Sequence, residues 1–152
     1  MFSTVWLAAR LSFISPQAAP PGLRKSFCRS VITSAAEEVQ RAFPDARVVG
    51  AFKNVWWEVF DAPRFGGMVS DVFVVGDDDQ AKRRFLALVE GMPFRFLDAG
   101  RLQNARTVER MTLLSGELGQ RQGYFPRMNY RLLGEPWSAG RDDRFKELIA
   151  SR

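Results

Sequence analysis

The feature that most constrains the fold is a strand, helix, strand pattern between residues 71 and 100. DVFVV, residues 71–75, is apolar on both faces, as expected for a strand in a sheet that helices cover. FRFLDAG, residues 94–100, alternates Phe94 and Phe96 inward with Arg95 outward, which predicts another strand. If the two strands are parallel, the connection between them is a right-handed crossover, and the chain belongs to the α/β class.

The segment between these strands has the pattern of an amphipathic helix. Its apolar residues recur at helical spacing, and its basic residues are predicted to face solvent. Gly91 and Pro93 end the pattern, so the helix is expected to cover one face of the sheet and then stop. The apolar stripe comprises Ala81, Phe85, Leu88, Val89 and Met92, and the outward set comprises Lys82, Arg83 and Arg84.

Three consecutive aspartates, Asp77, Asp78 and Asp79, separate the first of these strands from the helix. A calcium loop needs ligands at alternating positions and a final bidentate carboxylate, which this stretch lacks unless Glu90 leaves the helix. A phosphate would be repelled by the three acids. An N-cap followed by first-turn acids that complement the helix dipole explains the pattern better. We therefore predict no metal site here.

Shorter patterns surround this unit. SAAE at residues 34–37 is a capping box, which marks the start of a helix. The other signals are apolar runs, Pro and Gly clusters and amphipathic spacing. They predict, in chain order, a helix from about Ala35 to Phe43, a strand at 46–52 (ARVVGAF), a short helix at 53–60, a loop at 61–67 (DAPRFGG), a helix from Leu102 or Asn104 to about Leu118, a basic segment at 127–133 (RMNYRLL) and a short final helix at 142–149.

The chain is expected to hold one folded unit at residues 33–133, preceded by a leader and followed by a polar tail at 134–152. Residues 1–32 contain no acid and supply most of the net charge of +5. This composition is typical of a mitochondrial or plastid transit segment, and a mis-assigned start is the alternative. The compartment is therefore expected to be the cytoplasm, or an organelle if the transit segment is real.

Composition excludes several classes of chemistry. The chain has no histidine and a single cysteine, Cys28, so histidine-dependent hydrolysis and a thiolate metal cage are excluded. No apolar run reaches the length of a membrane span. Beyond the leader the charges nearly balance, which disfavours a nucleic-acid surface. No G-x-G-x-x-G run follows a strand, so the usual dinucleotide fingerprint is missing.

DAGRLQNAR, residues 98–106, has the small and polar residues of a chain that leaves a strand and enters a helix. Asn104 and Arg106 are candidates for binding an anionic ligand, because helix starts favour anions and an arginine can hold two oxygens. Helix capping is the alternative for these residues, and composition alone favours it.

Four stretches in order resemble the C-terminal half of the NADPH-dependent reductases of the deazaflavin coenzyme F420. They are SAAEEVQRAFPDARVVGAFKNV (34–55), FGG (65–67), DVFVVGDDDQAK (71–82) and LDAGRLQNAR (97–106). The last two, at this separation, carry most of the specificity. The resemblance covers about residues 33–133.

The resemblance implies a partial Rossmann-like sheet, of which RVVGAF is the last strand, followed by a small C-terminal α/β domain. It implies hydride transfer between NADP and F420 or another flavin, and no metal. The family's glycine-rich NADP-binding half has no counterpart in this chain. Carried over by position, the cofactor-binding residues are expected to be Phe52, Lys53, Asn54, Asn104, Arg106 and Arg131. Lys53 stands where the family usually has His or Asn. No residue is assigned a catalytic role.

Two functions of different class follow from the sequence. In the first, the chain is a truncated or divergent oxidoreductase that is inactive alone and works with a partner that supplies the Rossmann half. In the second, it is a non-catalytic remnant that binds a protein partner or forms a homodimer through the sheet face left open. Neither hypothesis involves nucleic acid or a membrane.

Overall fold

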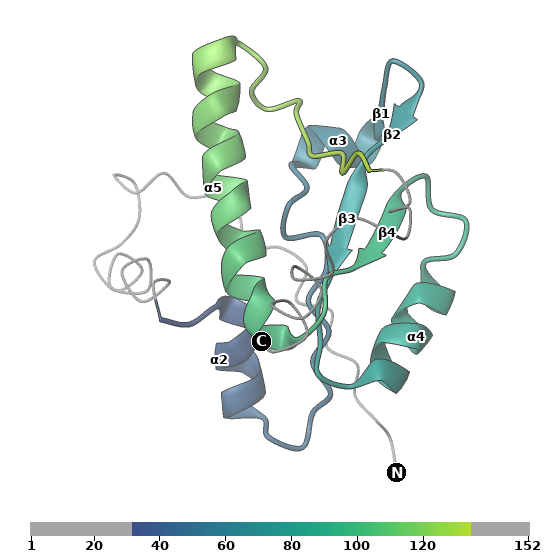
Figure 1. Cartoon of the computed structure of the whole chain (residues 1–152), viewed down its shortest axis with the longest axis vertical. Coiled ribbons are helices and arrows are strands. Elements are labelled where there is room, and N and C mark those ends of the chain that lie inside the picture. The colour runs from purple at the N-terminus through teal and green to yellow at the C-terminus, as the bar shows by residue number, and fades with distance from the viewer. Residues whose placement is uncertain (1–31, 135–152) are drawn as a thin grey trace, which may run out of the picture.

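The computed structural model describes residues 32–134, which form helices around two small sheets (Figure 1). The expected leader and the short helix expected at 142–149 lie outside the described residues. None of the helices within 32–134 is long and apolar enough to cross a membrane. The elements are α2 (Ala35–Ala42), α3 (Trp57–Asp61), β1 (Arg64–Phe65), β2 (Met68–Val69), β3 (Asp71–Val74), α4 (Asp79–Leu88), β4 (Arg95–Asp98), the 3-10 helix η1 (Leu102–Asn104) and α5 (Ala105–Gln122).

The strand, helix, strand unit is confirmed, and its two strands are parallel. β3 and β4 pair in register from Asp71 opposite Arg95 to Val74 opposite Asp98. Between them, α4 begins where expected, because the carboxylate of Asp78 accepts a hydrogen bond of 2.7 Å from the amide of Ala81. The fold is α/β, as the sequence predicts.

Two side chains of α4 lie opposite to the prediction. Leu88 is 77% exposed, because the face of α4 that packs on the core runs through Phe85 and Leu86 to Val89, just past the end of the helix. Lys82 is only 6% exposed. Its stem passes Gly76, where a Cβ would lie 3.3 Å from the lysine Cγ. Glycine therefore makes room for a lysine that points inward, toward the end of β4.

The strand expected at residues 46–52 is reduced to two bridge residues, Val49 and Gly50. Gly50 and Val75 pair antiparallel through hydrogen bonds of 2.8 and 2.9 Å, and no further ladder forms in the described chain. Two residues later the chain leaves extended geometry, because Phe52 has a φ of 58°. The alternation of faces survives, since Val48 packs in one core cluster and Val49 in the other.

The loop expected at 61–67 is instead part of a short hairpin. β1 and β2 pair antiparallel, with Phe65 opposite Met68. Gly66 and Gly67, which separate them, have φ of 53° and 90°. A two-residue hairpin turn of this kind needs positive φ at both positions, so the Gly-Gly pair that indicated a loop also closes the hairpin.

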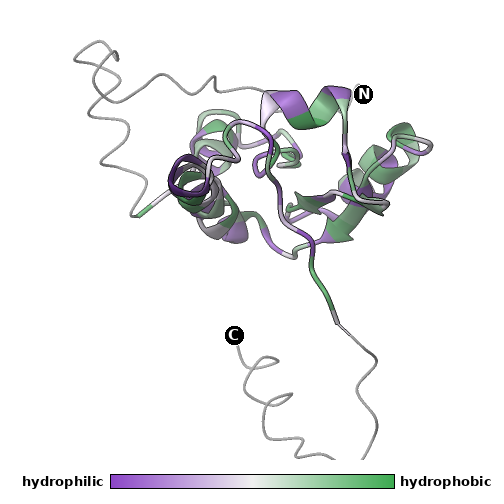
Figure 2. Ribbon diagram, turned by 90° about the horizontal axis from the view of Figure 1, so that it is seen from above, coloured by the Kyte–Doolittle hydropathy of each residue, from purple (hydrophilic) through white to green (hydrophobic). Residues whose placement is uncertain are grey.

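Two apolar clusters fill the space on either side of the central segments. Phe85 and Val89 from α4 pack against Val72 and Val74 in the first. Ala36 from α2 joins Ala105 and Val108 from α5 in the second. Helices thus cover both faces, with α4 on one side of the strands and α2 with α5 on the other (Figures 1 and 2). The predicted start of α2 is confirmed, since the Ser34 hydroxyl accepts from the Glu37 amide at 3.2 Å.

Candidate functional site

The turn at residues 52–54 positions the first three predicted cofactor residues. Phe52 is the one non-glycine residue with positive φ within residues 32–134. Such strain persists only where the surroundings impose it. Here the surroundings are four phenylalanine rings, with centroids 5.4 to 6.2 Å from that of Phe52. The ring of Phe52 therefore anchors the turn in the core.

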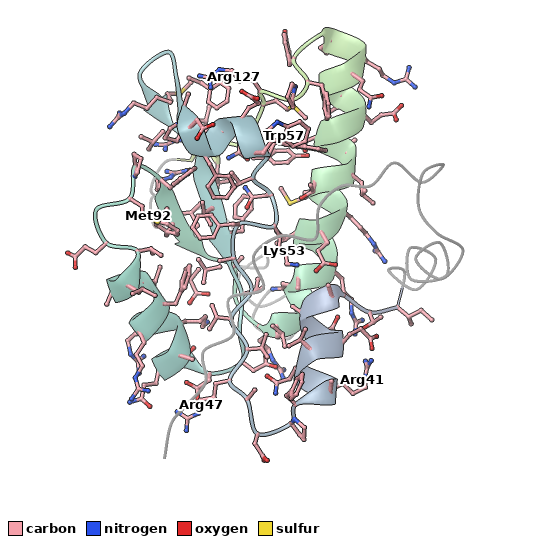
Figure 3. The ribbon with its side chains drawn as sticks, turned by 180° about the vertical axis from the view of Figure 1, so that it is seen from behind. Arg41, Arg47, Lys53, Trp57, Met92 and Arg127 are labelled. Carbon is pink, nitrogen blue, oxygen red and sulfur yellow. The ribbon has the colours of Figure 1, made fainter. Side chains whose placement is uncertain are left out.

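Lys53 points from this turn toward α5, near the middle of the molecule (Figure 3). Its side chain is 10% exposed, and its ammonium lies 3.7 Å from Oε1 of Glu109. That distance is an ionic contact but too long for a hydrogen bond. The hydroxyl of Thr112 donates to the carbonyl of Lys53 and ties the turn to the helix.

Glu109 is the partner that the sequence did not indicate. Its Oε2 accepts a hydrogen bond of 3.2 Å from the amide of Ala35, at the start of α2. Its Oε1 is buried and has no hydrogen-bond partner within residues 32–134. The ammonium of Lys53 and Oε1 of Glu109 therefore each have no hydrogen bond within residues 32–134. Among the predicted polar residues, Lys53 is the one whose side chain is not already held by an internal hydrogen bond in this part of the chain.

Asn54 is fully buried and its side chain is fully used. Its amide nitrogen donates to the carbonyl of Asp71 at 2.7 Å and to Oδ1 of Asn129 at 3.1 Å. Its oxygen accepts from the amide of Phe73 at 3.2 Å. The side chain of Asn54 therefore hydrogen bonds to the backbone of β3, as an adjacent strand would, and it presents no free group to a cofactor.

Arg131 meets Asn54 indirectly, through Asp71. The carboxylate of Asp71 is 0% exposed and accepts two hydrogen bonds from Arg95, at 2.8 and 2.7 Å. Arg131 adds a contact at 3.4 Å, and the amide of Leu132 donates at 2.7 Å. Burial raises the pKa of Asp71, but the hydrogen bonds from Arg95 and Leu132 outweigh it and hold this pKa below its ordinary value.

The same contacts correct the outward orientation predicted for Arg95. Its side chain is 36% exposed, yet its guanidinium bends back to cover the buried carboxylate of Asp71. The sequence holds one sign of this network: Asp71, a charged residue, is the first residue of the apolar strand DVFVV. The sequence does not show where its partners come from.

Arg106 is held by Glu37. The guanidinium donates through Nε at 2.7 Å and through a terminal nitrogen at 2.5 Å to the two carboxylate oxygens. The carboxylate therefore occupies the place that an anionic ligand would need at this fork. The hydrogen bond from Arg106 is also the main reason that the pKa of Glu37 is lowered. Arg106 thus joins α5 to α2.

Asn104 lies at the carboxyl end of β4, where its side chain donates to the carbonyl of Ala99 at 2.7 Å. Near the same edge, Lys82 forms hydrogen bonds of 3.0 and 2.9 Å with Asp98. Asp77 accepts from the amide of Leu102 at 3.1 Å. The predicted aspartates thus stabilise helix starts, and within residues 32–134 no cluster of three or more potential metal ligands forms.

Acidification should test the Glu37 to Arg106 pair. A carboxyl whose pKa is lowered by folding contributes stability above its unfolded pKa, and that stability is lost as the pH falls through the folded pKa. Glu37, Asp71 and Asp98 all have lowered pKa values, from ordinary values of 4.5 and 3.8. Replacing Glu37→Gln is therefore expected to flatten the fall in unfolding free energy below about pH 5 in urea titrations.

The matched control for this titration is Glu117→Gln, which alters an exposed i, i+4 ion pair with Arg121 on α5. Its pH dependence should run parallel to that of the unaltered protein. Parallel curves for Glu37→Gln as well would contradict the assignment of the acid-sensitive contact to Glu37.

The comparisons with known proteins agree with the family resemblance seen in the sequence. Over 87 residues the chain is 34% identical to the F420-dependent NADP reductase of Methanocaldococcus jannaschii. This matched segment covers 53% of this chain and 36% of the reductase. No protein-family model matches the chain. The resemblance is confirmed at the level of a shared segment.

Two solved structures are similar to the fold. A protein proposed to be an F420-dependent NADP reductase, from Arthrobacter sp. FB24, has a TM-score of 0.59 and 27% identity over 65% of this chain and 46% of that protein. A hypothetical protein from Sinorhizobium meliloti has a TM-score of 0.50 and 24% identity over 66% of this chain and 47% of that protein. The chain therefore spans less than half the length of these relatives.

Proposed function

We propose that this chain is the ring-positioning part of an oxidoreductase that moves hydride between NADP and a deazaflavin or flavin. The observation that carries the proposal is the strained turn at Phe52, which holds Lys53 inside the molecule against Glu109, within a chain similar to F420-dependent NADP reductases. The NADP-binding half would be supplied by another segment or another polypeptide, since the relatives are more than twice as long as the matched part.

Only some of the expected cofactor-binding residues have a polar group that is free to contact a cofactor. The ammonium of Lys53 lies 3.7 Å from Oε1 of Glu109, an acceptor atom that has no hydrogen-bond partner within residues 32–134. Asn54 and Arg106 are occupied by internal partners, so they shape the site without touching a ligand. The bound cofactors would themselves supply the hydride donor and acceptor.

What the protein contributes is position and charge. Phe52 fixes the backbone of the turn, and Lys53 presents a cation to an anionic group of the deazaflavin. Glu109 keeps that cation oriented toward α5. No general acid or base is needed for hydride transfer, which is consistent with a chain that has no histidine.

The proposal is tested by fluorescence titration of the chain with F420 and with NADPH. We expect weak F420 binding, no saturable NADPH binding, and a loss of about tenfold in F420 affinity for Lys53→Met. Lys82→Met is the matched control, because Lys82 is an equally buried lysine whose partner is Asp98 at the other end of the sheet. Its F420 affinity should stay within about twofold of that of the unaltered chain.

Three results would contradict the proposal. Saturable micromolar NADPH binding by the chain alone would show a nucleotide site that we do not expect. Equal F420 affinity for Lys53→Met and the unaltered chain would remove Lys53 from the site. No F420 binding even when the N-terminal half of the Methanocaldococcus jannaschii reductase is added would remove the oxidoreductase role.

A protein-interaction role is the second candidate, and exposed aromatic residues favour it. Trp57 and Phe60 on α3 are 46% and 44% exposed, and Phe125, whose ring centroid is 5.5 Å from that of Trp57, is 39% exposed. Apolar rings gathered at one end of a small domain are typical of a surface that binds another protein. Sedimentation equilibrium of the chain, with and without the reductase half described above, would separate a homodimer from a complex with that half.

A further inference from the structure

A pocket of about 350 Å³ opens between the β1–β2 hairpin and residues 124–131, the segment that follows α5. Apolar and aromatic side chains form most of its wall, among them Phe65, Met68, Tyr124 and Met128. Figure 3 shows Arg127, another lining residue, at the hairpin end of the molecule, away from Lys53. Lys53 is not part of this wall, so the pocket is distinct from the turn at residues 52–54.

One polar side chain of this pocket has an unmet hydrogen bond. Ser70 is 2% exposed and lines the pocket. Both of its backbone groups are hydrogen bonded. The amide donates to the carbonyl of Pro63, and the carbonyl accepts from the backbone amide of Arg95, both at 2.9 Å. Its hydroxyl has no partner among the described residues. A buried hydroxyl in a native protein is nearly always paired, so this one can donate to a bound group once its side chain turns toward the pocket.

The charge around the pocket is positive. The guanidinium of Arg127 donates to the carbonyls of Ala62 and Arg64, at 2.8 and 2.9 Å, and lies 4.8 Å from the ring centre of Phe65. Because those acceptors are neutral carbonyls, its charge is not cancelled there. Arg131 also lines the pocket and donates to the carbonyl of Val69 at 2.7 Å.

The carboxylate of Asp71, which contacts Arg131, does not remove this charge. It is fully buried and is already matched by Arg95, with Arg131 at 3.4 Å as a second cation. Two arginines therefore line an apolar pocket, and none of its lining residues is acidic. Aromatic walls with a positive rim favour a planar apolar anion over a neutral or cationic compound.

We propose that this pocket binds a small aromatic carboxylate, with its ring among Phe65, Met68 and Tyr124. The carboxylate faces the arginine side of the pocket, and an acceptor oxygen takes the hydrogen bond that Ser70 leaves unmade. This inference goes beyond the proposed function and does not depend on it, because neither Lys53 nor a nucleotide is involved. It gives Arg131, which the resemblance implies is a cofactor-binding residue, a different ligand.

The test uses 1-naphthoate as the probe and the full chain as the protein, with calorimetry for affinity and ¹⁵N chemical shifts for location. We expect saturable binding with shifts at the hairpin and at residues 124–131. Met68→Glu should weaken binding by about tenfold or more, since it adds a negative charge to an exposed position in the wall. The matched control is Met92→Glu, a partly exposed methionine outside the pocket, which should leave the affinity within about twofold.

Ser70→Ala gives a second, independent readout. It should weaken 1-naphthoate binding by about threefold or more while leaving the chain at least as stable, because it removes a buried hydroxyl that has no partner. The uncharged 1-naphthalenemethanol should bind more weakly than 1-naphthoate. Absence of saturable 1-naphthoate binding, equal losses for Met68→Glu and Met92→Glu, or shifts confined to other elements would each overturn the proposal.

Discussion

Replacing Asp71→Ala is expected to lower the free energy of unfolding by about 3 kcal/mol. The fully buried carboxylate is the shared acceptor for Arg95, Arg131 and the amide of Leu132. Removing it leaves the amide of Leu132 and the partly exposed guanidinium groups of Arg95 and Arg131 without their shared acceptor. Urea denaturation at neutral pH, followed by circular dichroism, measures the loss.

The control for this substitution is Asp45→Ala, which alters an exposed aspartate in the loop after α2 and should change stability by less than about 0.5 kcal/mol. If Asp71→Ala does not fold, the isosteric Asp71→Asn gives the same comparison in milder form. Hydrogen exchange adds a local readout, since the amide of Leu132 should lose protection. A loss below about 1 kcal/mol, or unchanged protection of Leu132, would contradict the role given to Asp71.

Truncating Phe52→Ala should also cost about 3 kcal/mol, because its ring is the shared neighbour of Phe60, Phe85, Phe94 and Phe96. The backbone at this position offers a sharper test. With φ at 58°, alanine keeps the strain that phenylalanine has, whereas glycine does not.

Phe52→Gly is therefore expected to be more stable than Phe52→Ala by about 1 kcal/mol, although glycine is normally the less stabilising of the two. Guanidinium denaturation of both variants under the same conditions gives the difference. A more stable alanine variant would show that the backbone at residue 52 is not strained in the way its φ indicates. The turn at residues 52–54 would then give no support to a functional role.

The elements that could be predicted from the sequence are those whose signals are local. The start of α4 depends on Asp78 and Ala81, three residues apart, and that of α2 on Ser34 and Glu37. The parallel pair of β3 and β4 follows from the apolar strands on either side of an amphipathic helix. Each of these depends on the chemistry of neighbouring residues, which a sequence pattern records.

The elements that could not be predicted depend on contacts between distant residues. Lys82 was expected outside, but Asp98 of β4 draws it inward. Arg106 was a candidate for anion binding, but Glu37, 69 residues earlier, holds its guanidinium. The segment at 46–52 had the composition of a strand, but it contributes only the bridge residues Val49 and Gly50 before the turn at Phe52. Lys53 stays a predicted cofactor residue, because its neighbour Glu109 leaves capacity for a ligand.

The contacts of Asp71 also bear on when the protein can finish folding. This carboxylate lies in the first long strand, yet its hydrogen bond from Leu132 joins residues 61 positions apart, and Asn54 reaches Asn129 across 75. Closures over such separations are slow, because the chain entropy is lost before the contact forms. During synthesis β3 must therefore wait until residues 129–132 have left the ribosome. Until then Asp71 lacks two of its partners, and the sheet edge that residues 129–132 later cover remains open to other chains.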